Sequence, residues 1–550
     1  MRVSRLAAVV LAILVLAPAL AQAAPQAGGG VLIRVYIDVA VNGNATVTYV
    51  VSGSGKYSFW LFLPKFEEVR GAAVKGGFRI VENRTSSFYF YYNSTVEASP
   101  GGDGGYEFNL SYDFPYASIM AGYNGWFMSP ALIAEPDIVT EVYVKIPFLK
   151  RVTLEEPRRV GSVDGYLVYK LYGAAYMQLG GRVTIEYDMT RPTPTANIMG
   201  VYDGVKVSVE YPVYYKGFAE KTVRTAGKAV PIYNRLFGAS PPAIEFRFYL
   251  PKKVMGGIGT LGFMRGSDVN VGGRGPIELN LALMRYAPGY HETTVLHEMV
   301  HKYLGLIGVE ATDETRWFHE GMAQYVSLMV GGEIGVPVGE LKSMLDNASE
   351  RLVKHLGGRL GFIQEWPYGS PELEGEAYLA SYYIVKTIAD RYGGEAYIER
   401  LSRAIREMGG IRTTQDVVDA MSAAAGEDLS RLFAQWGFTG VKPWQPPTPP
   451  QAPQSGGNET SSAGQQGTSE EQGGGQQEEN TPESFFNNAR NMLITSALVL
   501  SGLAAFIVYL VNTRISREVE IAMSRVYVPG EDEDEGGDVE KESPGGAGVD

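Results

Sequence analysis

The chain has 550 residues, of which 45% are hydrophobic and 20% are charged, a balance typical of globular protein. It contains no cysteine, which excludes disulfides, thiol catalysis and cysteine metal ligands. The formal net charge is -13 and no basic run of the kind that binds nucleic acid stands out, so we expect no nucleic-acid partner. A chain of this length exceeds one hydrophobic core, so at least two domains are expected.

Residues 1–24 have the pattern of a secretory signal peptide. Arg2 and Arg5 precede a short apolar run, and small residues stand at Ala21 and Ala23. The apolar run is short for a membrane span, so we expect cleavage after this stretch rather than an uncleaved anchor.

Residues 25–192 are expected to form a β-rich N-terminal domain. Their segments are rich in β-branched and aromatic residues and are separated by glycine-rich turns. This pattern predicts an antiparallel β-sandwich or saddle, in which the many tyrosines pack the sheets rather than form a binding stripe. The segments that most resemble strands are 31–41, 45–53, 57–64, 86–95, 140–148 and 181–189.

A second domain is expected at residues 193–440. Residues 218–238 have helical spacing and end at Gly238, whereas 243–251 and 259–266 resemble strands. Further helices are predicted at 291–305, at 317–330 and over most of 372–438.

The C-terminal part changes in composition. Residues 441–490 are rich in Pro, Gly, Gln, Ser and Glu and predict a disordered stalk. Residues 491–511 are apolar and long enough to cross a bilayer once. Arg514 and Arg517 follow this span closely, so the acidic tail at 512–550 is expected in the cytoplasm and the N-terminal bulk outside the cell. We therefore expect a single-pass protein of the cell membrane.

A metal-binding pattern lies in the predicted helix at 291–305. His297, Glu298 and His301 form the sequence H-E-x-x-H. Residues four apart share one face of a helix, so both imidazoles can reach one ion, and the glutamate can address a water held there. Zinc suits such ligands. The alternative is a helix with two surface histidines, but the apolar flanks favour a buried one.

A third ligand is expected at Glu320, which follows His301 after 18 intervening residues. It lies in a second predicted helix, and the loop between the helices is long enough to turn back. The alternative is an ordinary exposed glutamate. Trp317, Phe318 and Met322 around it favour a packed setting, in which a lone carboxylate needs a cation.

The H-E-x-x-H motif, the 18-residue spacing and the W-x-x-E-G context of Glu320 together resemble the gluzincin signature of M1-type aminopeptidases and their relatives. The resemblance covers about 193–438. It implies an α+β, thermolysin-like zincin domain with C-terminal helices. It also implies one zinc ion held by His297, His301 and Glu320, with Glu298 as the general base.

A further similarity lies at residues 376–401, which resemble the gluzincin helix that begins with a catalytic tyrosine. Tyr378 takes that position and would donate a hydrogen bond to the oxyanion. Tyr382 and Tyr383 are close by, and a packed helix tyrosine is the alternative for Tyr378.

The chain also departs from the family pattern. Residues 256–266 take the place of a "GAMEN"-like strand but contain no glutamate, so recognition of a free substrate N-terminus is in doubt. His319 stands where relatives often have Asn or Ser. We expect it to be exposed, with a place next to the metal ligands as the alternative. No role is assigned to His291 or His355.

Two functions remain open at this stage. The first is a membrane-anchored, extracellular zinc metallopeptidase that hydrolyses peptides or surface proteins, with an aminopeptidase as one form. The second is a non-catalytic surface or adhesion protein that uses a zincin-like scaffold. An intramembrane protease is set aside, because the metal motif is far from the predicted span.

Overall fold

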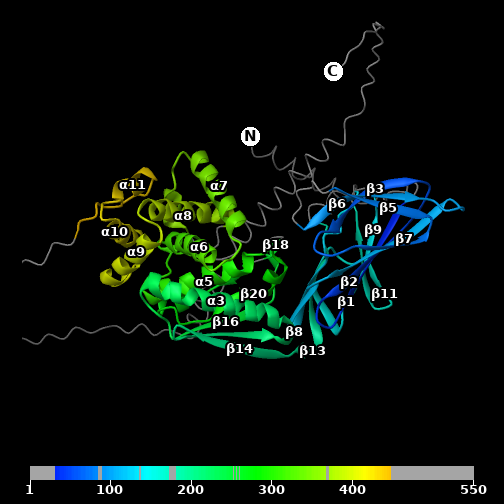
Figure 1. The fold of residues 1–550 in the computed structure, drawn as a ribbon, viewed down its shortest axis with the longest axis horizontal. Helices are drawn as coiled ribbons and strands as arrows, with labels where there is room; N and C mark the ends of the chain where they lie inside the picture. The colour runs from blue at the N-terminus through cyan, green and yellow to red at the C-terminus, as the bar shows by residue number, and fades with distance from the viewer. Residues whose placement is uncertain are drawn as a thin grey trace, which may run out of the picture. The chain divides into compact units, whose positions relative to one another are not determined.

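The structure, a computed structural model, describes residues 31–83, 90–135, 138–172, 181–251, 253–254, 257–258, 260–366 and 371–446. The predicted signal peptide, the membrane span and the cytoplasmic tail lie outside these residues, as does the stalk from residue 447 onward. Within them, no helix combines the length and apolar character needed to cross a membrane. The described chain is multidomain, with a sheet-rich N-terminal region and a helical C-terminal region (Figure 1).

The N-terminal region consists of strands whose alternate residues are buried. A seven-stranded sheet has the order β11-β12-β9-β1-β2-β7-β4, and two three-stranded sheets have the orders β10-β13-β8 and β3-β6-β5. The strands are β1 (Val31–Val39), β2 (Ala45–Ser54), β3 (Tyr57–Pro64), β4 (Arg70–Lys75), β5 (Gly77–Asn83), β6 (Tyr91–Ser99), β7 (Gly105–Phe114), β8 (Ser118–Met128), β9 (Thr140–Lys145), β10 (Leu149–Glu156), β11 (Gly161–Val163), β12 (Tyr166–Leu171) and β13 (Thr184–Thr193). In β1, for example, Ile33, Val35 and Ile37 all face one core, as period-two alternation requires.

The expectation of a purely antiparallel N-terminal sheet is wrong at one pair. Strand β1 pairs with β2 antiparallel but with β9 parallel, so that Ile33 lies opposite Thr140. The two parallel neighbours are separated by 100 residues of chain, and a connection of that length can return the chain in either direction.

The second region is built on a five-stranded sheet of order β14-β15-β16-β20-β19. The strands are β14 (Thr195–Tyr202), β15 (Val205–Pro212), β16 (Ala243–Tyr249), β19 (Gly262–Phe263) and β20 (Ile277–Asn280), and a separate hairpin joins β17 (Lys253–Val254) to β18 (Gly257–Ile258). The strand predicted at 259–266 shortens to β19, because only two of its residues pair with β20 before a helix begins at Gly266. The β14–β15 hairpin was not predicted, although Asp203 and Gly204 form the turn with positive φ that Asp-Gly favours.

Helices cover this sheet and form most of the rest of the region (Figure 1). The α-helices are α3 (Lys216–Phe237), α4 (Gly266–Asn270), α5 (Tyr290–Leu306), α6 (Arg316–Glu333), α7 (Gly339–His355), α8 (Pro371–Arg391), α9 (Glu395–Met408), α10 (Thr414–Ala425) and α11 (Ser430–Gln435). The 3-10 helices are η1 (Val213–Tyr215), η2 (Leu281–Arg285) and η3 (Gly361–Glu365). Helix α3 ends as predicted, because Gly238 adopts the left-handed conformation that commonly stops a helix.

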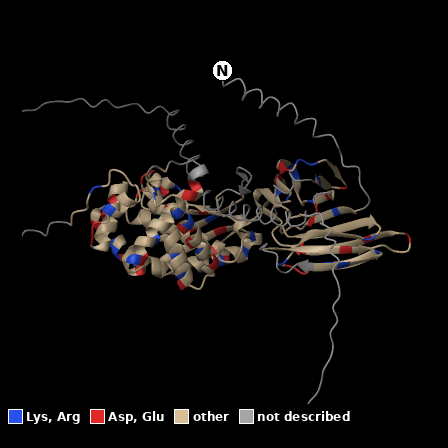
Figure 2. Ribbon diagram, turned by 90° about the horizontal axis from the view of Figure 1, so that it is seen from above, with Lys and Arg blue, Asp and Glu red and all other residues tan. Residues whose placement is uncertain are grey.

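Charged residues of both signs are distributed along these helices and strands. In the view of Figure 2 they do not gather into a patch of one sign on the described ribbon. Helices α5 and α6 instead carry buried polar residues; α5 packs against α6, and α6 packs in turn against α8. The candidate site lies where these three helices pack.

Candidate metal centre

The two histidines of the H-E-x-x-H motif lie on one face of α5, and Glu320 approaches them from α6. All three residues are buried, and their side chains are at most 7% exposed. The Nε2 atom of His297 is 3.2 Å from Oε2 of Glu320, and Nε2 of His301 is 3.7 Å from the same oxygen. The structure therefore brings together the three residues that the sequence predicts as metal ligands, across 18 intervening residues of chain.

The spacing of these atoms fits a metal ion. One ligand atom from each residue lies within 4.8 Å of the other two. Two ligands of a tetrahedral zinc ion, each about 2.0–2.1 Å from it, are roughly 3.3 Å apart, close to the observed 3.2 and 3.7 Å. Nε2 of His301 is buried and makes no hydrogen bond within the described part of the chain. A buried group of His297, His301 and Glu320 that could hold a metal ion is therefore present.

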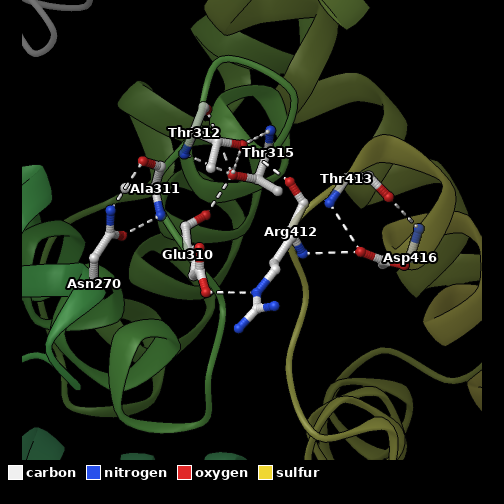
Figure 3. A network of polar contacts seen from close by, with 8 residues as sticks. All are labelled: Asn270, Glu310, Ala311, Thr312, Thr315, Arg412, Thr413 and Asp416. Carbon is white, nitrogen blue, oxygen red and sulfur yellow. Dashed lines mark hydrogen bonds and ion pairs between the residues drawn. The ribbon is translucent and has the colours of Figure 1, made fainter. Parts of the chain in front are cut away.

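The connection between α5 and α6 is held by a network of polar contacts (Figure 3). On one side, the backbone N–H of Ala311 donates to Oδ1 of Asn270 over 2.6 Å. On the other, Nε of Arg412 donates to Glu310 over 2.7 Å, and the hydroxyl of Thr312 donates to the carbonyl of Arg412 over 3.2 Å. Because this loop is tied to segments on both sides, α6 begins at a defined place and presents Glu320 to the histidines of α5.

A glycine allows α6 and α8 to approach closely. A Cβ atom at Gly321 would lie 2.5 Å from the carbonyl oxygen of Ser381 and 2.7 Å from Cγ2 of Val385. Gly321 directly follows Glu320, so the close contact brings α8 next to the metal centre. It also brings the buried side chain of Tyr378 near that centre.

Tyr378 lies in the same electrostatic environment as the predicted ligands. Burial raises the pKa of Tyr378 well above its ordinary value, and the charge of Glu320 raises it further. The phenol is thus kept protonated, as a hydrogen-bond donor must be. Its ring packs edge-on against Trp366, with the ring centroids 5.1 Å apart. The role of Tyr378 remains a prediction.

A buried ion pair that was not predicted from the sequence lies beside Tyr378. The Nη2 atom of Arg316 donates to both carboxylate oxygens of Glu374 at 2.9 and 2.8 Å. The guanidinium also lies 3.9 Å from the centroid of the Trp366 ring. Burial raises the pKa of Glu374 to about 7, although Arg316 opposes the shift. The two residues are 58 positions apart, so no local pattern links them.

Glu298 is held between α5 and strand β19. The residue is 2% exposed, and the backbone N–H of Met264 donates to the carboxylate. A Cβ at Gly262 would lie 3.0 Å from Oε1 of Glu298, so the strand passes directly over the carboxylate. Burial raises the pKa of Glu298 well above its ordinary value, and the charge of Glu320 adds to this effect. The second oxygen, Oε2, is buried and makes no hydrogen bond to any residue that the structure describes.

Of the three histidines that were not predicted as metal ligands, one is more buried than expected. The expectation that His319 is exposed is wrong, since it is 4% exposed and its Nδ1 lies 3.4 Å from Nδ1 of His301. The packing of α6 against α5 turns it inward. His291 is also buried and bonds through Nε2 to the hydroxyl of Thr222 over 2.8 Å, away from the predicted ligands. His355 is exposed at the end of α7.

Comparisons with known proteins give little beyond this geometry. No family model matches the chain, and no curated protein does. Among solved structures, the chain is similar to an aminopeptidase N family protein from Idiomarina loihiensis. The identity is 13%, the match covers 75% of this chain and 77% of that chain, and the TM-score is 0.34. At that score the similarity assigns neither an activity nor a site.

Proposed function

We propose that the chain is a zinc-dependent metallopeptidase that hydrolyses peptide bonds with water. The observation that carries this proposal is the convergence of Nε2 of His297, Nε2 of His301 and Oε2 of Glu320 in a buried site, with Glu298 adjacent on α5. Two histidines and a carboxylate form a ligand set that leaves a fourth position open, as in catalytic rather than structural zinc sites. A zinc ion bound there would lower the pKa of its water to about 7 and polarise the scissile carbonyl.

The remaining chemistry belongs to the chain itself. Glu298 has one buried oxygen that makes no hydrogen bond to the described residues, which supports a role as the base that takes a proton from the attacking water. It would then pass this proton to the leaving amine. Tyr378, kept protonated by its surroundings, would donate to the oxygen that becomes negative in the tetrahedral intermediate.

The proposal is tested with Glu298→Gln in the full chain, because this change keeps the shape of the side chain but removes the base. We expect the variant to bind one zinc ion, measured by metal analysis, while peptide hydrolysis falls by about a hundredfold or more. Glu333→Gln, at an exposed position near the end of α6, is the matched control and should hydrolyse peptides like the parent. Equal hydrolysis by the Glu298→Gln variant and the parent would overturn the proposal.

The substrate class is proposed as peptides or exposed segments of proteins outside the cell. The proposed location rests on the sequence patterns at 1–24 and 491–511. Protease added to intact cells should remove the N-terminal bulk and leave a tag at the C-terminus protected. Pairs of peptides with free and acetylated N-termini separate the two forms of the activity, since an aminopeptidase cleaves only the free member of each pair.

A further inference from the structure

A third imidazole lies against the metal centre without belonging to the group of candidate ligands. His319 precedes Glu320 on α6, and its Nδ1 is 3.4 Å from Nδ1 of His301. Both rings are buried. The corresponding atom of His297, Nδ1, is also buried but makes no hydrogen bond to any described residue. Of the two candidate ligand histidines, His301 is therefore the one whose outer nitrogen has a side-chain partner.

The positions of the nitrogens determine how this contact must be protonated. Nε2 of His301 faces Glu320 and is the atom that would bind a metal ion, so it must carry a lone pair rather than a proton. A neutral imidazole carries its one proton on the other nitrogen, which places it on Nδ1 of His301. Because that Nδ1–H points at Nδ1 of His319, the latter nitrogen accepts and the proton of His319 lies on its Nε2, a buried atom that makes no hydrogen bond of ordinary geometry to the described residues.

We propose that His319 is a positioning residue that accepts a hydrogen bond from Nδ1–H of His301 and thereby fixes the tautomer and ring orientation of that ligand. The inference rests on the proposed function only in taking zinc as the bound ion. Histidine ligands in metal sites ordinarily donate their second N–H to a carboxylate, a backbone carbonyl or water, and loss of that partner costs 10–100-fold in metal affinity. Here an imidazole takes the place of those acceptors.

The loop between α5 and α6 supports His319 in this position. The backbone N–H of His319 donates to the carbonyl of Thr315 over 3.0 Å. Thr315 in turn exchanges hydrogen bonds with Thr312, within the network of Figure 3. Burial lowers the pKa of His319 to about 4, and the backbone carbonyls of Glu310 and Val309, from the same loop, oppose this shift. The acceptor nitrogen is thus held in place by backbone contacts and not only by its own rotamer.

The test compares three substitutions of His319 in the full chain. In His319→Asn the amide oxygen reaches about the position of Nδ1 and can still accept, whereas in His319→Gln the amide reaches the position of Nε2 instead. His319→Leu removes the acceptor at similar volume. The exposed His355→Leu is the control. Zinc affinity is measured by competition with a chelator, and the visible spectrum of the cobalt-substituted protein reports the ligand geometry.

We expect the Leu and Gln variants to bind zinc 10–100-fold more weakly than the parent. The Asn and His355→Leu variants should bind like the parent, and the cobalt spectrum should change only in the Leu and Gln variants. Unfolding of the metal-free proteins shows whether a variant has lost its fold. If the Leu variant fails to fold, the zinc affinities of the Asn and Gln variants, which are both polar, show whether an acceptor at the position of Nδ1 is needed.

Equal affinities in the Asn, Gln and parent proteins would overturn this inference and leave the proposed hydrolysis intact. A parent that binds zinc but does not hydrolyse peptides would overturn the proposed function, while the affinity series still decides the role of His319. A parent that binds no zinc would overturn both.

Discussion

The close packing of α6 against α8 at Gly321 can be tested with one added methyl group. In Gly321→Ala the new Cβ would lie 2.5 Å from the carbonyl oxygen of Ser381, and backbone atoms cannot move aside as a flexible side chain does. The helices must therefore separate by a few tenths of an ångström or more. Overpacking of this kind costs about 1–3 kcal/mol. The same substitution stabilises an exposed helix position by about 1 kcal/mol, so the two effects oppose each other.

Gly332→Ala in the same helix is the matched control. A Cβ there would meet only Cγ2 of Val338 at 3.8 Å, which is an ordinary contact, and the position is exposed. We expect Gly332→Ala to raise the free energy of unfolding by up to about 1 kcal/mol. Gly321→Ala should leave it unchanged or lower it by up to about 2 kcal/mol, which is the packing cost minus the helix gain.

Both variants are measured by denaturant unfolding of the metal-free protein, so that zinc binding does not mask the difference. Peptide hydrolysis by the zinc-loaded Gly321→Ala variant should also fall, because Glu320 and Tyr378 lie on the two helices that must separate. Equal stabilisation by both substitutions would refute the reasoning, since it would mean that nothing crowds position 321.

Two further perturbations concern buried charge. Burial, with a smaller effect of Lys221, lowers the pKa of His291 to about 3, so the folded state keeps it neutral while the unfolded state takes up a proton below pH 6.5. The contribution of neutral His291 to the free energy of unfolding is complete above about pH 6.5 and is lost as the pH falls toward 3, with a loss of about 3 kcal/mol at pH 4.5. We expect His291→Asn to remove this part of the acid sensitivity. A profile of unfolding free energy against pH that is the same in the variant and the parent would contradict the assignment. Arg316→Met leaves the Glu374 carboxylate buried without its cation and should lower the free energy of unfolding in urea by about 3–5 kcal/mol. The double variant with Glu374→Met should lose less unfolding free energy than the sum of the two single variants. Strictly additive losses would show that the two side chains do not interact.

The local features of the candidate site could be predicted from the sequence because they depend on neighbours within one or two turns. The spacing of His297 and His301 places both imidazoles on one helical face, whatever surrounds the helix. The end of α3 at Gly238 follows from the freedom of glycine to adopt positive φ. The suggestion of Glu320 as a partner came from its spacing and from a family resemblance, and the structure places it within reach of both histidines.

Tertiary packing alone decided what surrounds these residues. The burial of His319 against His301, the pairing of Arg316 with Glu374 and the parallel pairing of β1 with β9 all join segments that are distant in sequence. No periodicity within a helix or strand encodes which distant segment will lie opposite it. The local sequence around a helical histidine is the same whether its face meets water or another helix. Only the packing of α6 against α5 buried His319. The physical reason is that local propensity depends on the backbone angles of neighbouring residues. The hydrogen-bond partner of a buried group depends instead on which distant segments pack against each other in the core.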